Sequence, residues 1–476
     1  MSDTTTKSPA LGALCLTRIA AASLVVAGPW ASAFAQAPAQ AAVPALPVVQ
    51  QVTGGMTLSQ AYEAALAQDA VIRAARATAD VKRERLPQAL SQLLPNVSAT
   101  YSKNRNDLLS SQPGLTGPVD SETFYGSSSR ALTIRQPIFR PFQALDYQQA
   151  KAQVADANAQ LERETQNLAT RVSGAFLEAL LAQDQYALAL VQETAYSTQL
   201  SAARRLFAGG AGVRTDVDDA QARLDMAIAQ KLVAQQNVEY TRRQLQVIVN
   251  VPVTKLATVD PAKLDIASAS AGRLEDWIDR AEANSPELVS LRAQRVASQR
   301  EVDKARTGHL PTLDAVAQWS VSDSDNVTRI NSRYDNRSIG VQLNVPIFAG
   351  GYVNSQVRQA LADLERAEQA LEATRRDLNL RVEKEYRGVT EGVAQIRALE
   401  QAVRSAEITV ESNRRSYQGG SRTLVDILNS EQQRVTAMRD LAQARYQYMA
   451  SHVRLRALVG QADATAIAEV NGWLKP

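Results

Sequence analysis

Residues 338–351 read Ser-Ile-Gly-Val-Gln-Leu-Asn-Val-Pro-Ile-Phe-Ala-Gly-Gly. Polar and apolar residues alternate up to Val345, which is the period of a β-strand. Pro346 follows at a place where a missing N–H is tolerated. From 352 to 417 the apolar residues recur every three, four or seven positions, which predicts a coiled-coil helix. At ~1.5 Å per residue, this helix would be roughly 100 Å long.

The same order of segments occurs earlier in the chain. Three pairs of motifs carry the match: Gln136-Pro137-Ile138-Phe139 with Val345-Pro346-Ile347-Phe348, Leu94-Pro95 with Leu310-Pro311, and Phe207-x-Gly209-Gly210 with Tyr417-x-Gly419-Gly420. Their spacing drifts only slightly, as loop insertions would cause. The sequence therefore predicts a tandem duplication, with repeats at 56–262 and 272–460, a linker at 263–271 and a C-terminal tail at 461–476.

Each repeat has the same predicted elements. The first is a helical stretch (57–92 or 273–308), followed by a β-hairpin (about 96–137 or 312–345). A very long helix comes next (141–207 or 352–417), and after a Gly-rich break there is another helix (213–249 or 423–459). The fold class is mainly α with a small β part.

The strand candidates are short and alternating, at 96–102, 131–136, 313–321 and 338–345, with polar loops expected at 107–127 and 324–335. About ten residues is the length that a membrane β-strand needs. Alternation alone leaves two interpretations open, because two ordinary hairpins packed on a helical domain would look the same. If the strands do cross a membrane, four are too few to close a barrel, and open edges cannot face lipid. Several chains would then have to contribute strands.

The N-terminus has the features of an export signal. Lys7 and Arg18 precede an apolar run at 19–28, and Ala33-Phe34-Ala35 follows. This order is typical of a secretory signal peptide, so we expect residues 1–35 to be removed. Residues 36–55, rich in Ala, Pro and Gln, predict a flexible leader.

Composition excludes several classes of protein. The 476 residues carry 52 basic and 49 acidic side chains, two His and one Cys. A net charge of +3 gives no reason to expect nucleic acid as a partner. A His/Cys zinc site or an internal disulfide is not feasible with this inventory. No nucleophile, metal or phosphate motif is present, so neither enzyme activity, nor a metal, nor a cofactor is expected.

One stretch resembles a known family. Residues 417–429 read Tyr-Gln-Gly-Gly-Ser-Arg-Thr-Leu-Val-Asp-Ile-Leu-Asn, and Ala444-Arg445-Tyr446-x-Tyr448 follows. With the Pro-Ile-Phe and Leu-Pro motifs and the duplication, they resemble the TolC-like outer membrane channel-tunnel family of Gram-negative bacteria over residues 57–460.

The resemblance implies an assembly. Three copies would form one 12-stranded transmembrane β-barrel in outer membrane lipid, with four strands per chain. Their helices would form an α-helical tube through the periplasm. An inner-membrane transporter, of the ABC or proton-driven type, and a periplasmic adaptor would dock at the inner end. The chain would then be the exit duct for type I protein secretion or drug efflux. The alternative from the sequence is a periplasmic coiled-coil adaptor without a pore.

The resemblance also suggests roles for the Gly-break hairpins. Tyr417 and Arg422 match family positions that bond to Asp216 and Thr215 of a neighbouring copy and hold the periplasmic gate. Without the family, they would be solvated residues at the hairpin end.

Asp426 and Asn429 match two carboxylates that ring the family's constriction. Because Asn429 is neutral, we expect a weaker preference for cations here. Asp426 has a second interpretation as a helix-start residue.

Glycines and prolines mark the remaining candidate positions. Gly209, Gly210, Gly419 and Gly420 are expected to end the long helices with positive φ and to give the adaptor a surface of small residues. Strand–helix junctions are expected at Pro95, Pro137, Pro311 and Pro346.

Overall fold

The structure is a computed structural model that describes residues 55–475, except for 115–116, 261–262, 264–271 and 325–331. The predicted signal peptide (1–35) lies outside the described residues. So do the predicted leader (36–55) up to its last residue and most of the predicted linker (263–271).

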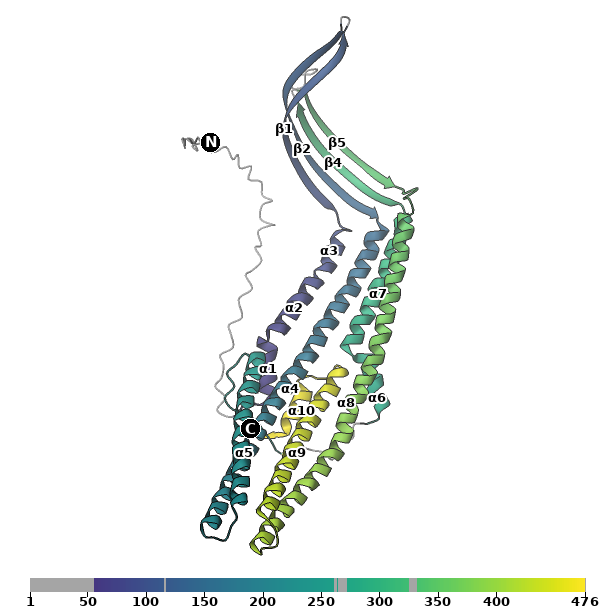
Figure 1. Ribbon diagram of the computed structural model, residues 1–476. Coiled ribbons are helices and arrows are strands. Elements are labelled where there is room, and N and C mark those ends of the chain that lie inside the picture. Colours follow the sequence, from purple (N-terminus) through teal and green to yellow (C-terminus); the bar gives the residue numbers. More distant parts are fainter. Residues whose placement is uncertain (1–54, 115–116, 261–262, 264–271, 325–331, 476) are drawn as a thin grey trace, which may run out of the picture. The chain divides into compact units, whose positions relative to one another are not determined.

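Both halves of the chain have the same order of elements (Figure 1). The first half contains α1 (Leu58–Gln68), α2 (Ala70–Arg83), α3 (Arg85–Ser91), β1 (Asn96–Gly114), β2 (Gly117–Phe139), α4 (Pro141–Ala208) and α5 (Arg214–Val249). The second contains α6 (Leu274–Asn284), α7 (Pro286–Arg306), the 3-10 turn η1 (Thr307–His309), β4 (Thr312–Ser324), β5 (Ser332–Asn344), α8 (Tyr352–Gln418) and α9 (Leu424–Leu458). The mainly helical class with a small β part is confirmed.

The four long strands form one antiparallel sheet in the order β1-β2-β4-β5. The two hairpins join through β2 and β4, where Leu132 lies opposite Trp319. The register places apolar residues on one face in every strand, as in the row Val97, Ile134, Ala317 and Ile339. The neighbouring row on the other face is Ser98, Thr133, Gln318 and Ser338. The sheet therefore has one apolar and one polar face.

The strands are longer than the sequence suggested. The loop expected at 107–127 is wrong, because its described residues continue β1 and β2, and Gly114 pairs with Gly117. Backbone hydrogen bonds between adjacent antiparallel strands do not need apolar side chains, so alternation misses the polar end of the hairpin. In the other hairpin, Ser324 pairs with Ser332, and residues 325–331 of the second expected loop lie outside the described residues.

The long helices form two antiparallel pairs, α4 with α5 and α8 with α9, and α9 packs against α4 (Figure 1). Helix α4 begins with Pro141 at its first position, where the missing N–H costs nothing. Before α8, Gly350 and Gly351 both have positive φ, at 59° and 83°, which turns the chain sharply out of β5.

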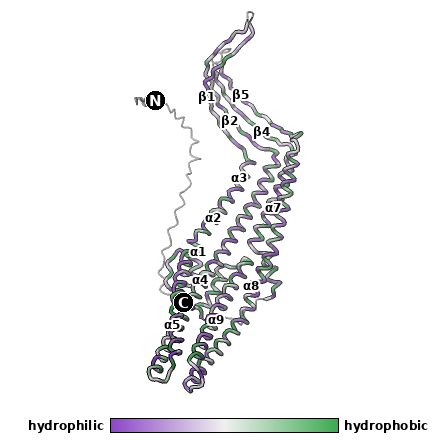
Figure 2. The backbone as a smooth tube through the Cα atoms, viewed as in Figure 1, coloured by the Kyte–Doolittle hydropathy of each residue, from purple (hydrophilic) through white to green (hydrophobic). Residues whose placement is uncertain are grey.

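The main core lies where the short helices pack around the middle of the long ones. Buried Phe176 of α4, Leu378 of α8 and Tyr448 of α9 belong to it. A smaller core, the hairpin-end core, lies near the ends of both helical pairs and includes Tyr196, Leu200, Ala220, Leu424 and Leu428. Figure 2 shows hydrophobic and hydrophilic residues alternating along the long helices. This pattern is expected for helices whose faces pack against different neighbours.

The segment after α9 is folded. Helix α10 (Ala464–Gly472) begins at the N-cap Asp463, and β6 (Leu474–Lys475) pairs with β3 (Thr258–Val259). Asn471 accepts a 3.1 Å hydrogen bond from the Leu58 N–H of α1. The end of the second half is thereby attached to the start of the first.

Within the described ranges, no helix combines the length and the hydropathy needed to span a bilayer.

Candidate functional site

The two helical pairs end next to each other in glycine-containing turns (Figure 1). Gly210 and Gly420 have φ values of 74° and 72°, but Gly209 and Gly419 have φ values of −82° and −81°. The expectation of positive φ is therefore correct only for the second glycine of each pair. The first glycine still closes the helix, since its N–H bonds to the carbonyl of Arg205 or Arg415 at 3.0 or 3.1 Å. The second takes the left-handed position of a helix C-terminal cap.

The two turns differ in how the next helix starts. Helix α9 begins at Thr423 with a capping box, in which Asp426 Oδ2 accepts from the Thr423 N–H at 2.9 Å and from its hydroxyl at 2.9 Å. These bonds, helped by the charge of Arg422, lower the pKa of Asp426. Helix α5 starts at Val213, which has no side chain able to cap. Asp216, the counterpart of Asp426 in the first repeat, is therefore not bound in a capping box.

Asp216 lies instead near the end of α8. Burial raises the pKa of Tyr417, and the negative charge of Asp216 raises it further. Tyr417 also packs on the hairpin-end core, while Thr215 is exposed. Tyr417 and Asp216 of one chain thus lie close enough to interact electrostatically, but no hydrogen bond joins them in the described structure.

Arg422 has only a loose partner in its own chain. Its guanidinium lies 3.7 Å from Asp426, and its side chain is 56% exposed. An exposed pair of this kind contributes ~0–1 kcal/mol. Arg422 is therefore available for another acceptor.

Asn429 has a partner that sequence reasoning missed. Its Oδ1 accepts a 2.7 Å hydrogen bond from Arg223 of α5, which places a positive charge beside the expected constriction residue. Arg223 lies two helical turns after Asp216 on the same face of α5. This seven-residue spacing is the sequence signal that could have identified Arg223 as a residue of the site.

Two further contacts join the helical pairs. Gln432 of α9 accepts from Gln192 at 2.7 Å and from the Tyr196 hydroxyl at 3.1 Å, both on α4. Higher up, the Tyr446 hydroxyl donates to Asp184 at 2.7 Å. Of these residues, only Tyr446 belongs to a motif quoted from the sequence, and that motif did not indicate its contact with Asp184.

The prolines lie at different positions around the strand ends. Pro95 and Pro311 directly precede β1 and β4. Pro346 lies two residues after the end of β5. Pro137 does not lie at a strand–helix junction. It lies inside β2 opposite Asp314, at a register shift. A bulge is one of the few places where a sheet tolerates proline.

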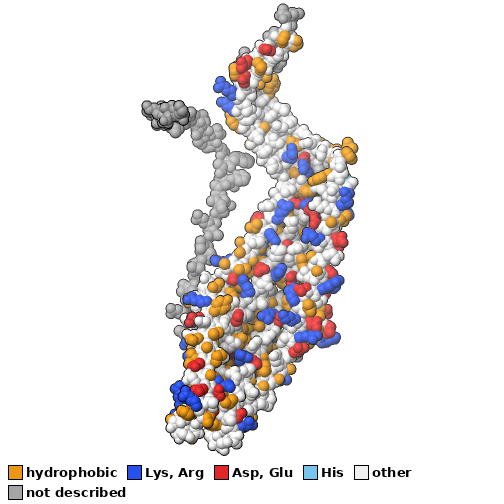
Figure 3. All heavy atoms as spheres, viewed as in Figure 1, with side chains coloured by type: hydrophobic (Ala, Val, Ile, Leu, Met, Phe, Trp, Pro, Cys, Tyr) orange, Lys and Arg blue, Asp and Glu red, His pale blue; other side chains and the backbone are white. Residues whose placement is uncertain are grey.

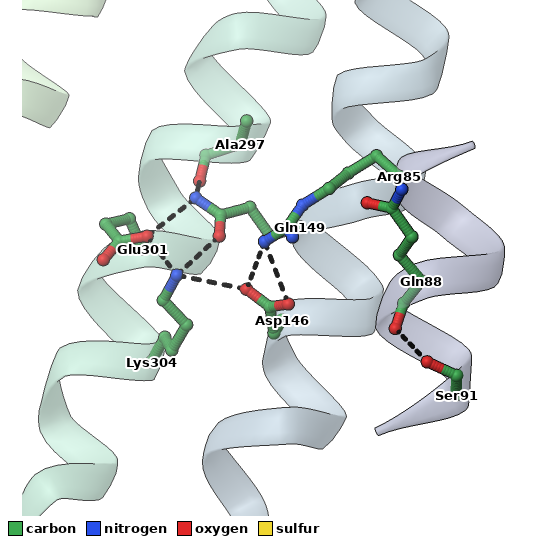
Figure 4. Close-up of polar contacts among 8 residues, drawn as sticks. All are labelled: Arg85, Gln88, Ser91, Asp146, Gln149, Ala297, Glu301 and Lys304. Atoms are coloured by element: carbon green, nitrogen blue, oxygen red, sulfur yellow. Dashed lines mark hydrogen bonds and ion pairs between the residues drawn. The ribbon is translucent and has the colours of Figure 1, made fainter. Parts of the chain in front are cut away.

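A buried polar cluster holds the upper helices together (Figure 4). Lys304 of α7 donates to Gln149 at 2.8 Å and lies 3.3 Å from the Asp146 carboxylate, both on α4. Arg85 of α3 pairs with the same carboxylate at 3.1 Å. Asp146 and Lys304 are only 4% and 9% exposed, so the charges neutralise each other out of contact with water.

Nothing in the described residues points to catalysis or metal binding. No group of three or more His, Cys, Asp or Glu side chains in these ranges could hold a metal ion. Figure 3 shows acidic and basic side chains interspersed over the visible helical face.

Comparison with known proteins gives consistent matches. Residues 61–251 and 277–461 match the family described as "Outer membrane efflux protein". The chain is 29% identical over 437 residues to "Proteases secretion protein PrtF" of Dickeya chrysanthemi, covering 90% of this chain and 94% of that protein. It is 32% identical over 408 residues to "Alkaline protease secretion protein AprF" of Pseudomonas aeruginosa, covering 85% of each. Its fold matches the crystal structure of the outer membrane protein VceC from Vibrio cholerae, with a TM-score of 0.73 at 17% identity over 85% of this chain and 96% of that one.

Proposed function

Because this chain belongs to the outer membrane efflux protein family and is a TolC-like outer membrane channel, not an enzyme, we propose that three copies of it form the exit duct of a tripartite export system. An inner-membrane transporter, ABC or proton-driven, and a periplasmic adaptor are its proposed partners. The membership was expected from the motifs at 417–429 and 136–139 and is confirmed.

One observation carries the proposal. The described sheet exposes an apolar face, with side chains of Ile339 and Val341 that are 92% and 72% exposed. Water disfavours such a surface by about 25 cal/mol per Å², whereas lipid does not. The same sheet leads directly into helical pairs whose surface carries mixed charges (Figure 3). A chain whose sheet is compatible with lipid and whose helices are compatible with water is suited to insert the sheet into a membrane and to extend the helices into the aqueous phase.

The sheet order supports the trimer. Strands β1 and β5 are at the edges of the sheet, and edge N–H and C=O groups cannot be left unpaired in lipid. Pairing β1 of one copy with β5 of the next closes the sheet after a whole number of copies. Three copies give the twelve strands that the family resemblance implies.

The hairpin ends are the proposed gate. Arg422 and Tyr417 of one copy would bond to Thr215 and Asp216 of the next, and Asp426 with Asn429 would ring the constriction. Arg422 is exposed and weakly paired, which leaves it free for such a link. Each link is modest in energy, so a docked partner can release it. The glycine turns at 209–210 and 419–420 are the proposed adaptor contact, because glycines allow close approach.

The substrate class follows from the relatives. PrtF and AprF are both named for protease secretion, which favours export of a polypeptide over efflux of small drugs. The transporter would then select the substrate, and this chain would conduct it.

The experiment is reconstitution in a planar bilayer. The purified protein should run as a trimer after chemical cross-linking and should conduct ions in discrete steps. A monomer that remains in solution without detergent and gives no conductance would contradict the proposal and favour the pore-free periplasmic adaptor.

A further inference from the structure

A pocket of about 310 Å³ lies where α9 ends and α7 begins. Its walls come from α4 and α8, and every lining residue belongs to one chain. The volume is at the lower end of the range for ligand sites in proteins, ~300–1,000 Å³. We call it the cationic pocket, because four basic side chains line it: Arg163, Arg381, Lys384 and Arg454.

The basic side chains outnumber the acidic ones. Two carboxylates, Glu287 and Glu385, also line the pocket, so four positive charges face two negative ones. Glu287 is shared, lying 2.7 Å from Arg381 and 4.0 Å from Arg163. Arg381 also pairs with Asp377 of its own helix at 2.8 Å, so two carboxylates neutralise it. Among the residues that line the pocket, the formal excess is two positive charges.

Two of the four cations have no acceptor in the described part of the chain. Neither Lys384 nor Arg454 makes a hydrogen bond or ion pair there. Both are exposed, and they come from different helices, α8 and α9. They therefore face the pocket with no carboxylate of the described residues at ion-pair distance, although Glu385 lines the same pocket.

The backbone adds to the positive potential. Ser285, Pro286 and Glu287 at the start of α7 line the pocket, and the N-cap Ser285 makes no side-chain capping bond. The amino end of a helix attracts anions. The carboxyl end of α9 is also near, but two of its last carbonyls are occupied. The Arg456 carbonyl accepts from the Gln461 N–H at 2.8 Å, and the Ala457 carbonyl accepts from the Gly460 N–H at 3.1 Å.

We propose that the cationic pocket binds a small multivalent oxyanion of the phosphate or pyrophosphate class. Lys384 and Arg454 would supply charge-assisted hydrogen bonds from two sides, and Arg163 would supply a third. Asn167 and Thr170 also line the pocket and offer neutral hydrogen-bonding groups. Bridging α8 and α9 in this way would hold these helices at the junction with α7.

The anion would come from the surrounding water and not from a lipid head group. Arg163 lies well inside α4, which starts at Pro141, so at ~1.5 Å per residue the pocket is roughly 33 Å along the helix from the strand ends. A lipid phosphate at the level of the sheet cannot reach it.

The test is isothermal titration of the full-length protein in detergent with sodium pyrophosphate at low salt. We expect saturable binding that Lys384→Gln with Arg454→Gln weakens at least tenfold. The matched control, Arg73→Gln with Arg243→Gln, removes the same charge from exposed positions outside the pocket and should leave affinity within twofold.

Three results would overturn the proposal. The first is no saturable heat with the wild-type protein at millimolar pyrophosphate. The second is equal weakening in the control, which would show non-specific charge attraction. The third is displacement of pyrophosphate by micelles doped with a phosphate-bearing lipid, which would assign the site to a lipid. Because the proposal requires no conduction, a failure in the bilayer experiment would not affect it.

Discussion

The Tyr446 hydroxyl of α9 donates a 2.7 Å hydrogen bond to the Asp184 carboxylate of α4. The two residues belong to different halves of the chain, and their contact joins the two helical pairs above the hairpin-end core. Burial raises the pKa of Asp184, although the bond from Tyr446 and the charge of Arg445 oppose the rise. Keeping Asp184 charged in the folded protein therefore costs free energy.

This cost predicts a pH-dependent effect of Asp184→Asn. An acid with a raised pKa in the folded protein favours folding when protonated, and that contribution is lost as the pH rises from the ordinary value of 3.8 through the raised one. The amide can still accept from Tyr446 and never ionises. The difference in melting temperature, variant minus wild type, should increase as the pH rises from 4 to 7.5. A difference that is constant with pH would contradict this.

The paired hairpin ends predict a gating phenotype. Tyr417→Phe with Arg422→Ser should raise single-channel conductance at least twofold, because both proposed links between copies are lost. Arg415→Ser is the control, since Arg415 lies nearby on α8 but pairs with Glu411 of its own helix at 2.9 Å. Equal conductance in all three proteins would rule out the gate assignment.

The bond between Arg223 and Asn429 predicts the effect of charge at the proposed constriction. Asn429→Asp should tighten block by a trivalent cation by about threefold, because a ring of carboxylates favours cations. Arg223→Gln added to it should tighten block further, since Arg223 donates to this position at 2.7 Å. Asn237→Asp, farther along α5, serves as the control. Unchanged block in the double variant would show that neither side chain faces the ion path.

The unequal helix starts predict opposite effects of two substitutions. Thr423→Ala removes the capping box of α9 and should lower the free energy of unfolding by about 1 kcal/mol.

Val213→Thr supplies the missing cap of α5 with Asp216 at the third position, and should slow amide exchange at the start of α5. It should also draw Asp216 away from Tyr417 and lower the pKa of that phenol. Hydrogen exchange and ultraviolet titration measure the two effects, and faster exchange in Val213→Thr would contradict the capping argument.

The buried Lys304 predicts a large loss of stability. Lys304→Met leaves Asp146 with Arg85 alone and should cost about 3–5 kcal/mol in unfolding. Adding Asp146→Leu should recover part of the loss, because the buried carboxylate is then gone and Glu301, which also loses its pairing with Lys304, is partly exposed to water. Lys151→Met is the exposed control on α4. Denaturant midpoints of the detergent-solubilised protein give the comparison, and a loss as small as that of the control would exclude a structural role.

The sequence indicated the long helices well because their stripes are periodic and their ends carry glycine or proline. The predicted helix at 141–207 is α4, and the predicted helix at 423–459 is α9. Strand length was underestimated because hydrogen bonds continue where alternation stops, as between Asp107 and Phe124.

The candidate site was predictable only in part. The repeat aligns Asp216 with Asp426, but it could not show that the Val213 start frees one carboxylate while Thr423 binds the other. Contacts such as Arg223 with Asn429 join residues far apart in the chain. Nothing in the sequence indicated that Lys304 is buried, because no local feature reveals that Asp146 lies opposite.

The edge strands β1 and β5 also constrain how the protein is made. Within one chain their outer N–H and C=O groups have no strand partner among the described residues. A lone newly exported copy entering the bilayer would bring both rows of polar groups into hydrocarbon, at several kcal/mol per unsatisfied group. Under the proposed assembly, copies would therefore have to meet before or during insertion, and the rate of biogenesis should rise steeply with the concentration of unassembled chains.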